Sequence, residues 1–355
     1  MTAEQSTAPA DSSTPGTTEI ERPLRATVLG TGAWGTTFAV VMADAGCDVR
    51  MWGRSAEVCA QITRDHRNSR NLPGVRLPAQ ITATTDAAAA LAGADLVVVA
   101  IPSQSARVTL TTLREHVPAD AVAVSLMKGV ELDTDRRMSE VVAEALGLPA
   151  RQVVVVSGPN LAREIAERQP TATVVAGTDP EATALVARAC TNPYFRPYTN
   201  ADVVGVELCG AVKNVIAIAV GIAQGKGFGL NTTATVITRG LVEITRLGRA
   251  LGANAETFPG LAGMGDLMAT CASPLSRNHT LGKHIGEGLT LEEAIAATGG
   301  TAEGVKSSRS VLELARSLGV DMPITQAVAA VLYEGLAVDD MARALLARPQ
   351  KAEGF

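Results

Sequence analysis

The sequence predicts an α/β protein with an amino-terminal Rossmann-like, mostly parallel sheet and a carboxyl-terminal all-helical domain. A glycine-rich turn, Gly30-Thr31-Gly32-Ala33-Trp34-Gly35, stands directly after a strand-like run. Near-continuous Val and Ile runs, typical of strands buried on both faces of a parallel sheet, recur as far as about residue 176. From about residue 200 onward long helical patterns replace them.

The first predicted βαβ unit explains the three glycines. Residues 25–29 form a strand and residues 36–45 a helix, and residues 47–52 form a second strand. Gly30 permits the sharp turn, and Gly32 lets the backbone approach a pyrophosphate. Gly35 lets the helix pack close against the strand. This stretch is therefore interpreted as a dinucleotide-binding turn.

Arg54, just after the second strand, bears on the choice of dinucleotide. Units of this kind usually carry an acid there, which accepts hydrogen bonds from the adenosine ribose of NAD. A planar guanidinium instead suits a 2′-phosphate. The sequence thus favours NADP(H), with NAD(H) possible, against the alternative that Arg54 is only a solvated residue at a strand end.

The later elements follow from the same patterns. Further core strands are expected at 95–100, 121–126, 153–156 and 172–176. Long helices are expected at 202–224, 231–251, 303–318 and 324–335. The expected organisation is a tail at 1–22, a dinucleotide-binding Rossmann-like domain at 23–199 and a helical substrate-binding domain at 200–355. Ligands should lie in the crevice between the two domains.

Composition excludes several classes of function. With 46% hydrophobic and 19% charged residues, a net charge of −5 and a pI near 5.5, the chain has no general attraction for nucleic acid or anionic membranes. Five scattered cysteines without a CxxC pair indicate reduced thiols in a cytoplasmic protein. The spacing of the four histidines does not favour a zinc site, and no metal is expected.

Two segments bear on targeting and membrane insertion. The first 22 residues are rich in Thr, Ser, Pro and Ala and contain acids, which favours a disordered tail over a signal or transit peptide. The most apolar long window, 203–223, is interrupted by Glu207, Lys213 and Asn214. It is better interpreted as a buried helix than as a membrane span.

Polar groups inside apolar surroundings indicate where the chemistry lies. An unpaired ammonium within the apolar helix around Lys213 would be costly, so this lysine is either paired with an acid or kept at a depressed pKa for proton transfer. Lys128 and the run 157–160 follow two predicted core strands. The later runs 263–266 and 276–278 would singly be a turn and a helix cap. Together these groups suit a small phosphorylated alcohol or ketone.

On these motifs the chain resembles the bacterial NAD(P)-dependent sn-glycerol-3-phosphate dehydrogenases, from about residue 24 to about residue 346. Six motifs occur in the family's order: 30–35, 128–129, 157–159, 210–215, 263–267 and 276–278. The resemblance implies reversible reduction of dihydroxyacetone phosphate to sn-glycerol 3-phosphate, which supplies phospholipid synthesis. It also implies that Lys213 is the general acid/base.

The resemblance assigns the remaining site residues one by one. Substrate contacts match Lys128, Gly158, Asn160, Lys213, Asn214, Asp266, Ser276, Arg277 and Asn278. Cofactor contacts match Gly30, Gly32, Ala33, Trp34, Gly35, Arg54, Lys128, Ala162, Arg277, Thr301 and Glu303. The family more often has a hydroxyl residue at position 160 and a branched apolar residue at 301. Pairing with Asp266 would raise the pKa of Lys213 and desolvation would lower it, and the sequence leaves that balance open.

Two other classes of protein share parts of this pattern. Other two-domain reductases, such as 3-hydroxyacyl-CoA and 6-phosphogluconate dehydrogenases, favour different catalytic surroundings. A non-enzymatic NADPH sensor would need the glycine-rich turn but not Lys213, Asp266 and Arg277 together. The expected partner is a small molecule, and the apolar carboxyl-terminal helices could pack within one chain or across a homodimer.

Overall fold

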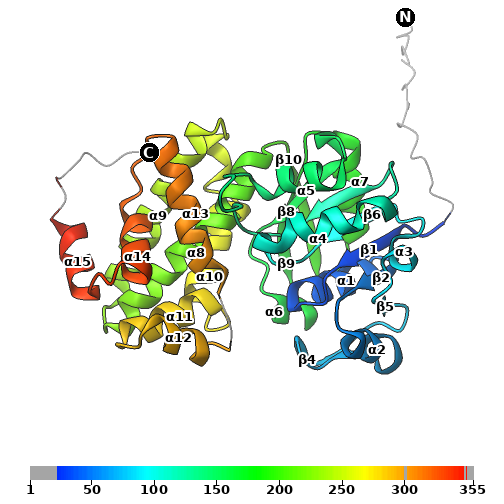
Figure 1. The fold of residues 1–355 in the computed structure, drawn as a ribbon, viewed down its shortest axis with the longest axis horizontal. Coiled ribbons are helices and arrows are strands. Elements are labelled where there is room, and N and C mark those ends of the chain that lie inside the picture. The colour runs from blue at the N-terminus through cyan, green and yellow to red at the C-terminus, as the bar shows by residue number, and fades with distance from the viewer. Residues whose placement is uncertain (1–21, 300–301, 348, 350–355) are drawn as a thin grey trace, which may run out of the picture.

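The computed structural model describes residues 22–299, 302–347 and 349. Thr301 and residues 1–21 of the expected tail lie outside this range. Arg22, the last residue assigned to that tail, forms an ion pair with Asp95 at 2.7 Å. Figure 1 shows a sheet-containing part, coloured blue to green, beside a helical part, coloured green to red.

The main sheet has eight strands in the order β10-β9-β8-β7-β6-β1-β2-β5, and β3 and β4 form a separate hairpin. The strands are β1 Arg25–Leu29, β2 Asp48–Trp52, β3 Arg67–Asn68, β4 Leu72–Arg76, β5 Thr82–Thr84, β6 Leu96–Val99, β7 Val122–Ser125, β8 Val153–Ser157, β9 Thr171–Ala176 and β10 Phe195–Asn200. Every neighbouring pair in the main sheet is parallel except β8 with β9. The expected mostly parallel, Rossmann-like sheet is confirmed.

Helices cover both faces of this sheet, since β6, β7 and β8 are buried throughout. The helices of this part are α1 Ala33–Asp44, α2 Ala56–Asp65, α3 Ala87–Leu91, α4 Ala106–Leu113, α5 Met138–Leu146, α6 Ala162–Ala166 and α7 Pro180–Cys190. Helix α1 begins at Ala33, three residues before the helix expected from the sequence. Its first turn therefore starts inside the glycine-rich motif.

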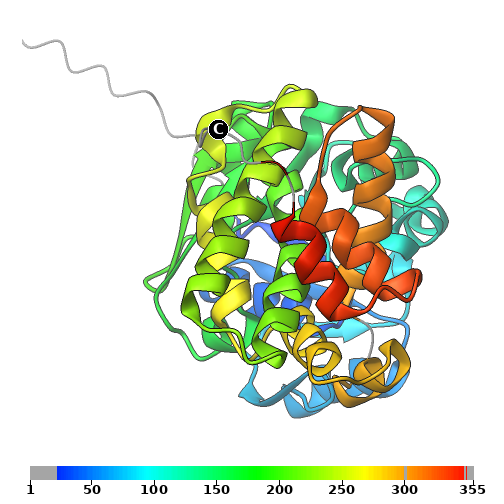
Figure 2. The ribbon, with the colours of Figure 1, turned by 90° about the vertical axis from the view of Figure 1, so that its left-hand side faces the viewer.

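The second part is helical, as expected. It contains α8 Val203–Gly225, α9 Leu230–Ala250, α10 Asp266–Ala272, α11 Arg277–Gly286, α12 Leu291–Ala297, α13 Glu303–Ser317, α14 Pro323–Tyr333 and α15 Val338–Leu346. Helices α9, α10, α11 and α13 pack against α8, which forms the axis of this part. Figure 2 shows these helices facing the viewer, with the sheet behind them.

Helix α8 is long and apolar enough to cross a membrane, but 89% of its most apolar window is buried within the protein. It is thus a core helix, as its interrupting polar residues indicated. Glu207 on α8 accepts hydrogen bonds from the backbone N–H and hydroxyl of Ser139 and from Arg137 of the sheet part, at 2.6–2.7 Å. A buried carboxylate therefore joins α8 to the start of α5.

Glycines let α8 and α11 approach each other at backbone distance. A Cβ added at Gly282 would lie 2.1 Å from the carbonyl oxygen of Ile218, and one at Gly221 would lie 2.1 Å from that of His279. Neither position has room for a side chain. This close packing places Asn278 of α11 opposite Asn214 of α8, where the two side chains are hydrogen-bonded at 2.9 Å.

Candidate active site

The glycine-rich turn has the geometry that an anion needs. Gly30 has a φ of +118°, and a Cβ there would lie 2.4 Å from the carbonyl oxygen of Ala100. A Cβ at Gly35 would lie 2.7 Å from the carbonyl oxygen of Gly30, whereas one at Gly32 would meet nothing within 4 Å. Gly30 and Gly35 are thus required by packing, and Gly32 leaves an open approach to the start of α1.

Trp34 stands in the first turn of α1 beside this opening. Its ring packs edge-on against Phe38, with 5.5 Å between ring centroids. Its buried Nε1 has no hydrogen-bond partner within the described structure. A buried indole N–H usually has a hydrogen-bond acceptor, so the Trp34 N–H is available to donate to a bound molecule.

A lysine-aspartate-lysine cluster lies at the carboxyl edge of the sheet. Lys213 of α8 donates to Oδ1 of Asp266 at 2.5 Å, and Lys128, which follows β7, donates to Oδ2 of the same carboxylate at 2.7 Å. Lys128 also donates to the carbonyl oxygen of Gly158 at 3.2 Å. Asp266 begins α10, directly after a π-helical turn at Leu261–Gly265. The sheet part and the helical part therefore both contribute to one cluster.

Burial and charge act against each other on Lys213. Its side chain is 8% exposed, and desolvation lowers its pKa to about 8. The Asp266 carboxylate opposes this shift and the Lys128 ammonium adds to it. The balance that the sequence left open thus favours desolvation: Lys213 is paired with Asp266, and its pKa is nevertheless depressed.

Thr270 was missed by the sequence analysis. It lies one turn after Asp266 on α10, and its hydroxyl accepts a hydrogen bond from Lys213 at 2.6 Å. The spacing of four residues from Asp266 places both side chains on one helix face, and this spacing could have indicated it. A threonine in an ordinary helix carries no other signal.

Residues near the start of α11 form another side of the site. Ser276 caps this helix by accepting from the backbone N–H of His279, and Arg277 is exposed. The carbonyl oxygen of the Asn278 side chain accepts from the backbone N–H of Gly304, so this amide joins α8, α11 and α13. The structure thus brings Asn214 and Asn278 together and gives both a packing role.

Glu303 begins α13 in the same region. Burial raises its pKa, although the positive charges of Arg277, Lys128 and Lys213 oppose that rise. All three cations are therefore within electrostatic reach of one carboxylate. Such a concentration of cations suits a ligand that carries several negative charges.

Gly158 and Asn160 follow β8 at the same edge. Gly158 has a φ of +146°, and a Cβ there would lie 3.2 Å from Thr173. The side-chain nitrogen of Asn160 donates to the hydroxyl of Thr173 at 3.0 Å, and its buried Oδ1 has no partner in the described chain. The bond to Thr173 fixes the orientation of the Asn160 amide, so its Oδ1 is available to accept a hydrogen bond from a hydroxyl or amide of a ligand.

The other expected cofactor residues lie around the glycine-rich turn. Ala162 begins α6, and its carbonyl oxygen accepts from Thr37 of α1 at 3.0 Å. Arg54 lies two residues after β2, is exposed, and has no ion-pair partner among the described residues. Thr301, the remaining expected cofactor contact, lies outside the described residues.

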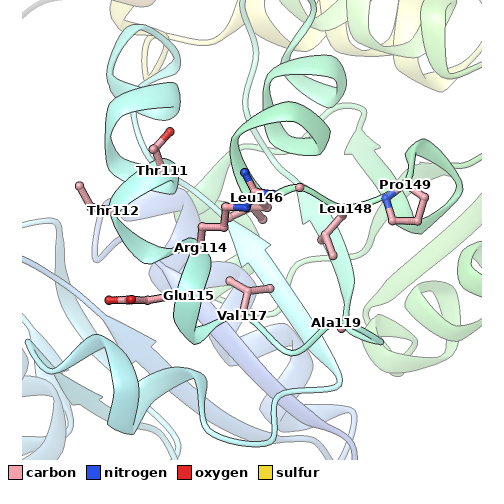
Figure 3. A pocket seen from close by; sticks show the side chains of 10 residues that line it. Thr111, Thr112, Arg114, Glu115, Val117, Ala119, Leu146, Leu148 and Pro149 are labelled. Atoms are coloured by element: carbon pink, nitrogen blue, oxygen red, sulfur yellow. The ribbon is translucent and has the colours of Figure 1, made fainter.

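A separate hollow lies at the opposite edge of the sheet (Figure 3). Its lining comes from segments that precede β7 and β8, including Arg114, Val117 and Pro149. The residues of the lysine-aspartate-lysine cluster follow the carboxyl ends of these strands instead. This hollow therefore does not belong to the candidate active site.

Comparison with known proteins identifies the family. The sequence profile described as NAD-dependent glycerol-3-phosphate dehydrogenase N-terminus matches residues 25–183, and the C-terminus profile matches residues 202–343. The chain belongs to the NAD-dependent glycerol-3-phosphate dehydrogenase family. It is thus an oxidoreductase, and the resemblance inferred from the six motifs is confirmed.

Individual members of this family are similar over almost their whole length. A glycerol-3-phosphate dehydrogenase [NAD(P)+] of Streptomyces griseus is 57% identical over 94% of this chain and 99% of its own. One from Thermobifida fusca is 56% identical over 92% and 98%. The crystal structure of glycerol-3-phosphate dehydrogenase from Coxiella burnetii has a TM-score of 0.87 at 36% identity and covers 92% of this chain and 99% of its own.

Proposed function

We propose that this protein reversibly reduces dihydroxyacetone phosphate to sn-glycerol 3-phosphate with NADP(H), and also with NAD(H). The observation that carries the proposal is the Lys213–Asp266–Lys128 cluster at the carboxyl edge of the sheet, the edge at which the open glycine-rich turn also lies. The names of the similar Streptomyces and Thermobifida proteins support the same reaction.

The described residues fit a nicotinamide dinucleotide. The open space at Gly32 and the N-terminal turn of α1 suit a pyrophosphate, and the unpartnered Nε1 of Trp34 is a donor beside it. Gly30, Ala33 and Gly35 would hold the turn, while Ala162 and Glu303 would border the cofactor. The bound cofactor would supply or accept the hydride at C2 of the substrate.

Lys213 is the proposed general acid/base. In reduction its ammonium would give a proton to the C2 oxygen, and in oxidation its neutral amine would take that proton from the C2 hydroxyl. A pKa of about 8 leaves both forms present near neutral pH. Asp266 and Thr270 would keep the Nζ atom in one place, since both bond to it in the described structure.

The remaining groups would bind the substrate. Arg277 is the proposed phosphate ligand, because its guanidinium can form two hydrogen bonds to phosphate oxygens. Ser276, Asn278 and Asn214 would add neutral hydrogen bonds beside it. Lys128, Gly158 and Asn160 would bind oxygens at the sheet edge.

The first test follows loss of reduced-nicotinamide absorbance with purified protein, dihydroxyacetone phosphate and either NADPH or NADH. We expect oxidation of both nucleotides, with a higher kcat/KM for NADPH if Arg54 binds the 2′-phosphate. Equal use of both would demote Arg54 to a surface contact. Binding of NADPH without any turnover would favour the sensor alternative and refute the proposed reaction.

The role of Lys213 has its own test. Lys213→Ala should lower turnover by roughly 100- to 10,000-fold while NADPH binding stays near normal. Lys226→Ala is the matched control, because this lysine ends the same helix but pairs with Asp339 at the surface. Turnover that survives Lys213→Ala would refute the proton-transfer role.

The cellular setting is part of the proposal. The five cysteines are free and buried, which supports a reducing compartment and therefore the cytoplasm. There the product would feed glycerophospholipid synthesis. The proposed division at residue 200 is supported by the sheet's last strand ending at Asn200 and α8 beginning at Val203.

A further inference from the structure

The β3–β4 hairpin is attached to the glycine-rich turn. The side-chain nitrogens of Asn68 and Asn71 both donate to the carbonyl oxygen of Thr31, at 2.8 and 2.9 Å. Asn68 also donates to the hydroxyl of Thr36 on α1 at 2.8 Å. These bonds hold the tip of the hairpin beside the proposed pyrophosphate site, although the hairpin is not part of the main sheet.

Thr31 is also in contact with the end of β2. A Cβ added at Gly53 would lie 2.7 Å from the Thr31 methyl group, so the Thr31 side chain packs against the backbone of Gly53. Arg54 follows Gly53 directly, and Arg70 stands between Asn68 and Asn71. Both arginines are therefore adjacent in sequence to residues that contact Thr31.

The charges around this point are unbalanced. Arg54 and Arg70 are exposed, and neither has an ion-pair partner within residues 22–299, 302–347 and 349. Nearby Asp65 is paired with Arg64 at 3.1 Å. Two unpaired guanidinium groups beside an open anion site create a local positive potential in a chain whose net charge is −5.

We propose that Arg70 is a second cationic ligand for a phosphate group of the dinucleotide, acting together with Arg54. The inference rests on the proposed function and assigns a nucleotide-binding role to the hairpin. The ligand chemistry is a phosphate oxygen, supplied by either the 2′-phosphate or the pyrophosphate. A guanidinium held over either group can donate two hydrogen bonds to it.

The hairpin's attachment makes this proposal testable without unfolding the site. The asparagines, and not Arg70, tie the tip to Thr31, so Arg70→Gln leaves the tether in place. Arg76→Gln is the matched control, because Arg76 is an exposed, unpaired arginine of the described chain at the other end of β4. Asn71→Ala removes one tether bond and leaves Arg70 unchanged.

The experiment measures the Kd of NADPH and of NADH for the full chain and its variants by titration. We expect Arg70→Gln to raise the Kd of NADPH about tenfold, which corresponds to ~1.4 kcal/mol. An unchanged Kd for NADH then assigns the 2′-phosphate, and an equal rise for both nucleotides assigns the pyrophosphate. Asn71→Ala should weaken binding of the same nucleotide, and Arg76→Gln should change neither Kd.

Two results would overturn the inference in different ways. If the parent protein binds both nucleotides and Arg70→Gln binds them with Kd values within twofold of the parent, Arg70 is not a ligand. The proposed function is unaffected by that outcome. If the parent protein binds neither nucleotide, the proposed function is refuted, and the proposed contact between Arg70 and a phosphate group is refuted too.

Discussion

The depressed pKa of Lys213 predicts how the reaction depends on pH in its two directions. At pH 7 a lysine with a pKa of about 8 is neutral in roughly 10% of molecules, about 300 times the neutral fraction of an ordinary lysine. If Lys213 is the general acid/base proposed above, oxidation of sn-glycerol 3-phosphate needs its neutral amine, so kcat/KM for oxidation should rise with pH and level off above about 8. In the same proposal, reduction needs the ammonium form of Lys213, so kcat/KM for reduction should fall as pH rises past about 8.

Two variants should move this midpoint in opposite directions. Asp266→Asn removes the carboxylate that raises the pKa of Lys213, and the midpoint should fall below 8. Lys128→Met removes an ammonium that lowers that pKa, and the midpoint should rise. Both residues are expected to contact the substrate, so their loss should also lower the height of the profile, and the midpoint is therefore the informative quantity.

The assay is steady-state kcat/KM against pH in both directions, since this ratio reports groups of the free enzyme and free substrate. The substrate phosphate titrates near pH 6, below the window in which Lys213 should titrate. A parent midpoint near the ordinary value for lysine, or a shift of the same sign in both variants, would refute the assignment of the titration to Lys213.

Three further predictions concern stability and cofactor binding. Gly282→Ala should lower the free energy of unfolding by about 1–3 kcal/mol, because its Cβ would meet the α8 backbone. Gly229→Ala is the control and should not lower it, because nothing lies near a Cβ at that position. Equal melting temperatures for the two variants would contradict the packing argument. Glu243 is buried on α9 and accepts from two backbone N–H groups at the start of α14, and burial raises its pKa to about 7. Because the pKa is raised in the folded state, Glu243 contributes its full stabilisation below about pH 4.5, and this contribution to the free energy of unfolding is lost as pH rises through about 7. Denaturant unfolding at several pH values should show that loss in the parent protein and not in Glu243→Gln. Gly32→Ala should leave the melting temperature unchanged and weaken dinucleotide binding about tenfold or more, as titration would show; unchanged affinity would exclude Gly32 from the cofactor site.

Elements with a strong periodic signal were predictable, and short or polar ones were not. The continuous apolar runs of β6, β7 and β8 identified central strands, and the apolar length of α8 identified the core helix. Strand β10 was missed because Arg196, Pro197 and Tyr198 give an edge strand no apolar run. The hairpin of β3 and β4 was missed because it is short and mostly exposed.

The candidate site was predictable only in part, for a related reason. A lysine in an apolar helix is conspicuous, so Lys213 could be singled out from its surroundings. Asp266 lies against Lys213 because α10 packs on α8. No local sequence pattern predicts that packing. Thr270 and the tether from Asn71 to Thr31 are ordinary residues whose role comes from what folding places beside them.

The polar residues of α8 have a consequence for how the protein folds. Glu207 finds its partners on α5, Lys213 on α10 and Asn214 on α11. Each would be a costly unpaired group if α8 became buried before its partner arrived. The polar side chains of α8 thus all have partners only when the sheet part, α10 and α11 have packed against this helix. Assembly of the proposed catalytic groups and global folding should therefore be one cooperative event, and the helical part made alone should not reach its native packing.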